Sequence, residues 1–97
     1  MDNRINEIAL HHGLDEQLDQ TIEECAELIL AIRKYKRHID DVEPIQIYNL
    51  AKIGEEIVDV EIMIEQLKTL IEGFDFERFK DAQIKRELMR IKFKEGE

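Results

Sequence analysis

Apolar residues recur every three or four positions along most of the chain, which is the spacing of amphipathic α-helices. No stretch sustains the alternation of apolar and polar residues that marks a β-strand. The pattern predicts four helices, at about residues 2–12, 15–37, 45–71 and 76–93. We therefore expect an all-α fold with one domain, residues 1–97, that ends in a polar tail at about 94–97.

The expected helix boundaries coincide with residues that cap or end helices. These are Gly13 and Gly73 at C-terminal ends, Asp15 and Asp75 near N-terminal ends, and Pro44 in a first turn. Gly54 is different because it falls inside the third predicted helix, where glycine costs about 1 kcal/mol relative to alanine. Its place there suggests close packing or a local bend.

The two long predicted helices carry more apolar surface than one face of each can bury. The stripe on the second helix comprises Leu18, Ile22, Cys25, Ile29 and Ile32, with Leu28, Leu30 and Ala31 outside it. The main stripe on the third comprises Ile53, Ile57, Val60, Ile64, Leu67 and Ile71, and a second one Val58 and Ile62. A single small domain has little interior to cover these stripes. We expect a homo-oligomer, most simply a dimer with the long helices near its centre.

Composition narrows the classes of partner. The chain of 97 residues is 43% hydrophobic and 38% charged, as in a folded helical protein. Its net charge of -9 argues against binding to a nucleic-acid polymer or an anionic membrane. The single cysteine, Cys25, excludes an internal disulfide framework and a cysteine-based zinc site. With no signal peptide or membrane-spanning stretch in the sequence, we expect a cytoplasmic protein.

Two short acidic motifs lie within apolar sequence on the two long helices. They are Glu23-Glu24-Cys25-Ala26-Glu27 and Glu55-Glu56-Ile57-Val58-Asp59. Carboxylates three positions apart project from the same side of a helix, so two facing helices would bring four of them together. Such a cluster is unfavourable without a cation and suits Mg²⁺ or Mn²⁺, which take oxygen ligands. We expect the metal ligands to be Glu24, Glu27, Glu56 and Asp59.

A metal bound to these carboxylates would orient a phosphate chain, offset its charge and lower the pKa of a water molecule. The candidates for the general base are Glu23, Glu55 or one of the four ligands. Lys52 lies one turn before Glu56, where it could contact phosphate or could only pair with Glu56. The residues expected to contact substrate phosphate are Lys52 and, from the basic cluster at 33–37, Arg33 and Lys36.

Other readings of these residues stay open. Adjacent glutamates are common on solvated helix faces, and a di-iron site would need Glu-x-x-His pairs, which the chain lacks. The histidines (His11, His12 and His38) are expected in surface or turn positions, and Cys25 in the core. Tyr35 and Tyr48 are expected to pack, with stacking on a nucleobase as the alternative.

The order EExxE, a 28-residue spacer and ExxD resembles the MazG-type all-α nucleoside triphosphate pyrophosphohydrolases. The matching segments are residues 22–28 and 55–60, and the resemblance covers roughly residues 14–72. The spacer, which includes residues 38–44, is at the long end of the family's range. The resemblance implies a four-helix, bundle-like protomer that forms a homodimer or a dimer of dimers through its long helices. Glu24, Glu27, Glu56 and Asp59 match the family's metal ligands.

The same resemblance implies hydrolysis of a (d)NTP to (d)NMP and pyrophosphate with Mg²⁺, or with Mn²⁺ as a substitute, in clearing the nucleotide pool. Dimeric dUTPases and phosphoribosyl-ATP pyrophosphohydrolases share the family's core, so either substrate stays open. A hypothesis from another class is a non-enzymatic, oligomeric helical interaction module with solvated acidic residues.

Overall fold

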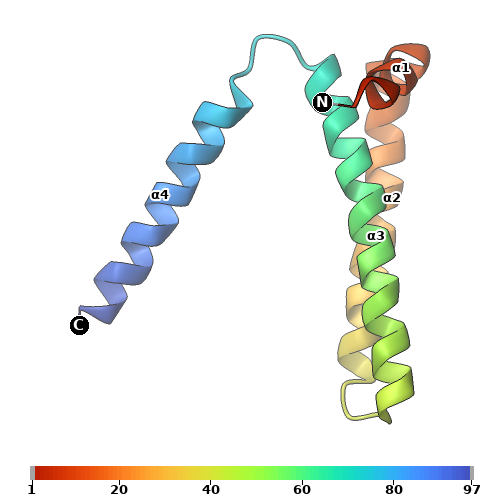
Figure 1. Ribbon diagram of the computed structural model, residues 1–97, viewed down its shortest axis with the longest axis vertical. Coiled ribbons are helices and arrows are strands. Elements are labelled where there is room, and N and C mark those ends of the chain that lie inside the picture. The colour runs from red at the N-terminus through yellow and green to blue at the C-terminus, as the bar shows by residue number, and fades with distance from the viewer. Residues whose placement is uncertain (1, 97) are drawn as a thin grey trace.

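The computed structural model describes residues 2–96 of the chain. Within this range the regular secondary structure consists of four helices and no strand (Figure 1). The helices are α1 (Asn3–His12), α2 (Leu14–Arg37), α3 (Glu43–Leu70) and α4 (Phe76–Glu95). The all-α prediction is confirmed. None of the four helices carries an apolar stretch long enough to cross a bilayer.

Capping residues explain where α1 ends and where α4 begins. Gly13 ends α1 at a φ of 85°, and its N–H donates a hydrogen bond of 2.8 Å to the carbonyl of Ala9. Asp75 caps α4 by accepting a hydrogen bond of 3.0 Å from the backbone N–H of Arg78. Helix α2 begins at Leu14, so Asp15 lies in its first turn, near the N-terminal end as expected, while Gly13 occupies the cap position.

The bounds of α3 and α4 differ slightly from those expected. Pro44 lies in the first turn of α3, as predicted. The helix ends at Leu70, and Gly73 lies beyond it, with a φ of 78°, in the connection to α4. Helix α4 continues to Glu95, so the predicted polar tail is helical at residues 94 and 95. Residue 97 of that tail lies outside the described residues.

Helices α2 and α3 form an antiparallel hairpin, and α1 packs against the end of it away from the α2–α3 loop (Figure 1). Two side-chain hydrogen bonds tie this three-helix unit together. Gln17 of α2 donates to Gln66 of α3 at 2.6 Å, in a buried position. Thr69 of α3 donates to Asn6 of α1 at 2.7 Å.

The buried side of the hairpin is unusually polar. The buried apolar residues among those described are Ala9, Val60 and Met63, whereas the buried polar ones are Gln17, Asn49, Glu56 and Gln66. Of the main apolar stripe predicted for α3 only Val60 is buried, and Ile57 and Ile64 are both 42% exposed. The stripe of α2 also faces outward, with Ile22 at 68% exposed. The two helices thus turn their amide and carboxylate groups toward each other.

Helix α4 lies apart from the three-helix unit (Figure 1). None of its residues, all of which the structure describes, is buried. Its start is fixed locally, because the ring of Phe74 lies 4.9 Å from that of Phe76 and 5.5 Å from that of Phe79. One copy of the chain therefore packs three of its four helices together.

Candidate metal centre

The register of the α2–α3 hairpin sets which residues face each other. Gln17 and Gln66 are hydrogen-bonded across it. Because the helices are antiparallel, each residue forward on α2 corresponds to one residue back on α3. The two acidic motifs therefore lie opposite each other, with Glu24 level with Asp59 and Glu27 level with Glu56.

Three of the four predicted ligands converge at this level of the hairpin. Carboxylate oxygens of Glu24, Glu27 and Glu56 all lie within 4.8 Å of one another. Glu56 is only 8% exposed. One oxygen of Glu24 and one of Glu56 are buried without a hydrogen-bond partner among the described residues. The other oxygen of Glu24 accepts a bond of 3.0 Å from Gln20.

The electrostatic consequence is visible at Glu27. The negative charge of Glu24 first, and that of Glu56 next, raises the pKa of the Glu27 carboxyl, and partial loss of water adds to the effect. The cluster contains hydrogen-bond acceptors only: one buried oxygen each of Glu24 and Glu56, and the carboxylate of Glu27 beside them. A cation with oxygen ligands satisfies all three groups at once, whereas a neutral ligand would leave their mutual repulsion in place.

The remaining acidic candidates stay outside this group of three. Asp59 is exposed on α3 at the level of Glu24, one helical turn after Glu56. Glu23 and Glu55 are exposed as well. Glu55 is held by Lys52, whose Nζ lies 3.2 Å from a Glu55 oxygen. This hydrogen bond raises the pKa of the Lys52 ammonium. The alternative that Lys52 pairs only with Glu56 is therefore wrong in this structure.

A cavity of about 250 Å³ opens beside the carboxylates. Glu27 and Glu56 line it together with Lys34, Lys52 and Tyr48. Two basic side chains and an aromatic ring therefore share a space with two carboxylates of the cluster. The Lys34 Nζ lies 6.0 Å from the centre of the Tyr48 ring, within the range of a cation–π contact.

The three basic residues predicted to contact phosphate line two different cavities. Lys52 lines the cavity beside the carboxylates, but Arg33 and Lys36 line a different cavity of about 420 Å³. The acidic motifs do not predict Lys34, which lines the cavity beside the carboxylates, or Asn49, whose Nδ2 is buried without a hydrogen-bond partner among the described residues. Each lies seven residues from an acidic residue on its own helix, Lys34 after Glu27 and Asn49 before Glu56. Seven residues are about two helical turns, so the spacing could have placed both on the side of the carboxylates.

The three histidines lie at exposed positions, as expected, whereas Cys25 is not among the buried residues of the core. His11, His12 and His38 are exposed. His38 lies at the α2–α3 loop, with its Nδ1 2.6 Å from an Asp41 oxygen. Cys25 is a free thiol in a half-buried position.

Comparison of the chain with protein-family models finds no match, and no curated protein or solved structure is significantly similar to it. A functional assignment therefore depends on the residues of the chain itself.

Proposed function

We propose that the chain is a Mg²⁺-dependent hydrolase that cleaves nucleoside triphosphates to monophosphates and pyrophosphate. One observation carries the proposal: carboxylate oxygens of Glu24, Glu27 and Glu56 converge within 4.8 Å. Glu24 and Glu56 each bury one oxygen that lacks a partner among the described residues, whereas Glu27 is exposed. The resemblance of the two acidic motifs to the MazG-type enzymes supplies the reaction. The nearby Lys34 and Lys52 suit a polyphosphate, which a carboxylate cluster alone would repel.

Each residue has a role in this proposal. Glu24, Glu27 and Glu56 hold the cation, with Asp59 as a fourth ligand from the level of Glu24. Bound there, a hard divalent cation supplies charge neutralisation for the phosphates and a water molecule of lowered pKa. Lys52 binds a phosphate oxygen from the wall of the cavity.

The choice of general base follows from position. Glu55 is the better placed of the two exposed candidates, because its partner Lys52 lines the same cavity as Glu27 and Glu56. Glu23 lies on α2. Among the described residues, neither Glu23 nor a side chain hydrogen-bonded to it lines that cavity. Proton transfer through Glu55 therefore fits the arrangement better, and Glu23 is the second candidate.

The proposal includes self-association, as the apolar stripes already predict. The radius of gyration is 17.5 Å, whereas a compact chain of this length has about 12.5 Å. The accessible surface is 8021 Å², whereas a compact monomer of this size has about 5,800 Å². The difference is of the order that a permanent dimer interface buries. We infer that a second copy covers the outward stripes of α2 and α3, and that α4 packs on that copy.

The direct test is a pyrophosphate-release screen over nucleoside and deoxynucleoside triphosphates with Mg²⁺ or Mn²⁺. We expect release from at least one of them, and Glu56→Gln should reduce it to background while the helical circular dichroism is unchanged. Glu61→Gln, at an exposed position of the same helix, is the matched control and should stay active. Phosphoribosyl-ATP belongs in the panel. Absence of release from every compound with both metals would contradict the proposal.

A helical interaction module is the second candidate, and the exposed apolar stripes favour it. The two functions differ in their response to metal. A cation that binds only the native state raises its stability by RT ln(1 + [L]/Kd). A melting temperature unchanged by millimolar Mg²⁺ or Mn²⁺ would favour the module over the hydrolase.

A further inference from the structure

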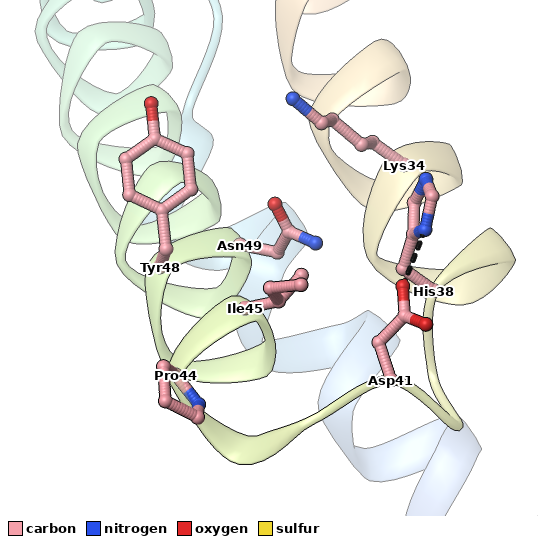
Figure 2. A pocket seen from close by; sticks show the side chains of 7 residues that line it. All are labelled: Lys34, His38, Asp41, Pro44, Ile45, Tyr48 and Asn49. Carbon is pink, nitrogen blue, oxygen red and sulfur yellow. Dashed lines mark hydrogen bonds and ion pairs between the residues drawn. The ribbon is translucent and has the colours of Figure 1, made fainter.

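A third cavity, of about 340 Å³, lies between the C-terminal end of α2 and the N-terminal end of α3 (Figure 2). Its volume is within the range of small-molecule sites. Lys34 and Tyr48 line both this cavity and the one beside the carboxylates. The two spaces therefore adjoin, and a single ligand could occupy both.

Asn49 is the residue that gives this cavity a chemical preference. It is 2% exposed, and its Nδ2 is buried without a hydrogen-bond partner among the described residues. Figure 2 shows its side chain pointing from α3 into the space that Lys34 and His38 approach from the side of α2. A buried amide donor without an acceptor costs about 1–3 kcal/mol. The cavity thus offers a donor on its wall to a ligand that brings an acceptor atom.

The wall formed by the α2–α3 loop is held in place by its own contacts. The Gln46 side chain donates to the carbonyl of Ile39 and, at 2.8 Å, to that of Asp41. The Nδ1 of His38 lies 2.6 Å from the Oδ2 of Asp41 in the same loop (Figure 2). The cavity is therefore formed before any ligand arrives, which reduces the ordering that binding requires.

The distance from Asn49 to the carboxylates suits one class of ligand. Asn49 and Glu56 are seven residues apart on α3, or about 10.5 Å at 1.5 Å per residue. That length is comparable to the span from the far edge of a nucleobase to the α-phosphate of an extended nucleotide. A base at Asn49 would therefore place the α-phosphate near Glu27 and Glu56. The proposed reaction needs it there, because it breaks the bond between the α- and β-phosphates beside the metal ligands.

We propose that the cavity at Asn49 is the nucleobase subsite of the site proposed above, and that Asn49 determines which base is accepted. The Asn49 amide donates to a carbonyl or ring nitrogen on the edge of the base, and its carbonyl can accept from an amino group. Tyr48 supplies an aromatic face beside the base, and Lys34 lies between the base and the phosphates. The inference rests on the proposed function for its ligand class, but it concerns different residues.

The test begins with nucleosides, which lack phosphate, and with metal-free protein. In ¹⁵N-labelled protein, the side-chain amide signal of Asn49 is assigned by its loss in Asn49→Leu and followed as each nucleoside is added to millimolar concentration. We expect a saturable shift with at least one nucleoside and none with ribose. No shift with any nucleoside, or an equal shift with ribose, would overturn the proposal. Either result would indicate that a water molecule or a second copy satisfies Asn49.

A kinetic comparison separates this inference from the proposed function. In an active enzyme, Asn49→Leu should lower kcat/KM for the preferred nucleotide by at least about tenfold, the loss expected for one hydrogen bond. Its rate on inorganic tripolyphosphate should not change, and Asn3→Leu, at an exposed position of α1, should match the parent. Pyrophosphate release, together with an Asn49 amide signal that does not shift with nucleosides and an Asn49→Leu variant that matches the parent, overturns the subsite alone. Nucleoside binding without pyrophosphate release overturns the hydrolase alone.

Discussion

At the scale of single residues, the α2–α3 interface concentrates polar groups that lack partners. Glu24, Asn49 and Glu56 each bury a side-chain atom that forms no hydrogen bond with the described residues. In contrast, Gln17 and Gln66 satisfy each other across the same interface. Buried polar groups without partners are rare in native proteins and call for a ligand or a water molecule. Two of the three belong to the carboxylate cluster.

Charge repulsion at this cluster predicts an unusual mutational effect. The pKa of Glu27 is raised in the folded protein, so its contribution to stability is present below the ordinary value of 4.5 and is lost as pH rises through the raised value. At pH 7 without metal, Glu27→Gln should therefore raise the melting temperature. The gain should disappear below pH 4.5, and Mg²⁺ should stabilise the parent far more than the variant.

The matched control for that experiment is Glu23→Gln, at an exposed position four residues earlier. It removes the same charge outside the cluster and should leave both the pH dependence and the response to Mg²⁺ close to those of the parent. A Glu27→Gln variant that is less stable than the parent at pH 7 in metal-free buffer would contradict the electrostatic account.

At the scale of the elements, helix type and approximate bounds could be predicted because they depend on local periodicity and capping. The buried faces of the long helices could not. The sequence places the α3 stripe on Ile57, Val60 and Ile64, but the structure buries Asn49 and Glu56 beside Val60. Hydrophobicity alone assigns the interior to the most apolar face, and that rule fails here because the α2–α3 contact is made by amide and carboxylate side chains. The proposed second copy and ligands would account for the difference.

Two glycines of different conformation give a paired test at this scale. Gly13 has a φ of 85° and a ψ of 169°, which only glycine adopts readily, so Gly13→Ala should destabilise the protein by about 1–3 kcal/mol. Gly54 is helical, and a Cβ there would meet nothing within 4 Å among the described residues. Gly54→Ala should stabilise the protein by about 0.5–1 kcal/mol.

Chemical denaturation of both variants measures the two effects under identical conditions. Since none of the described residues lies within 4 Å of a Cβ at Gly54, the structure gives no support to close packing within one copy as its role. A loss of stability in Gly54→Ala would contradict this reading and would indicate that another copy approaches the helix there.

The candidate site shows the same limit of prediction. Glu24, Glu27 and Glu56 could be predicted because their spacing fixes the side of the helix that they occupy. Lys34 and Asn49 could not be selected with equal force, because a lone lysine or asparagine carries no spacing motif of its own. The sequence predicts Arg33 and Lys36 from their charge alone. They lie one residue before and two residues after Lys34, so the turn of the helix places them at another cavity.

At the scale of the whole molecule, α4 has no buried residue within one copy, and its recorded contact with another helix is at its first residue, where the Lys68 Nζ of α3 lies 5.9 Å from the centre of the Phe76 ring. Ile84, Leu88 and Ile91 form a stripe at helical spacing, and each is about half exposed. An amphipathic helix gains most of its stability from packing such a stripe. The apolar stripes of α2 and α3 are also exposed and could pack against α4 of another copy. This supports the proposed assembly of two or more copies.

The stripe on α4 predicts a change of oligomeric state. Leu88→Asp should convert the assembly to monomers, because a charge at the buried centre of an interface is not compensated. Light scattering after gel filtration measures the mass directly. Gln83→Asp adds the same charge to the same helix outside the stripe and should leave the mass unchanged. A parent protein that is monomeric at micromolar concentration would contradict the assembly.

Anomalous X-ray scattering from crystals grown with millimolar Mn²⁺ tests whether Glu24, Glu27 and Glu56 together bind a divalent cation. We expect a manganese peak between these three carboxylates, and no such peak in crystals of Glu56→Gln. A well-diffracting crystal of the parent with Mn²⁺ in the medium and no peak between α2 and α3 would overturn the proposed metal site.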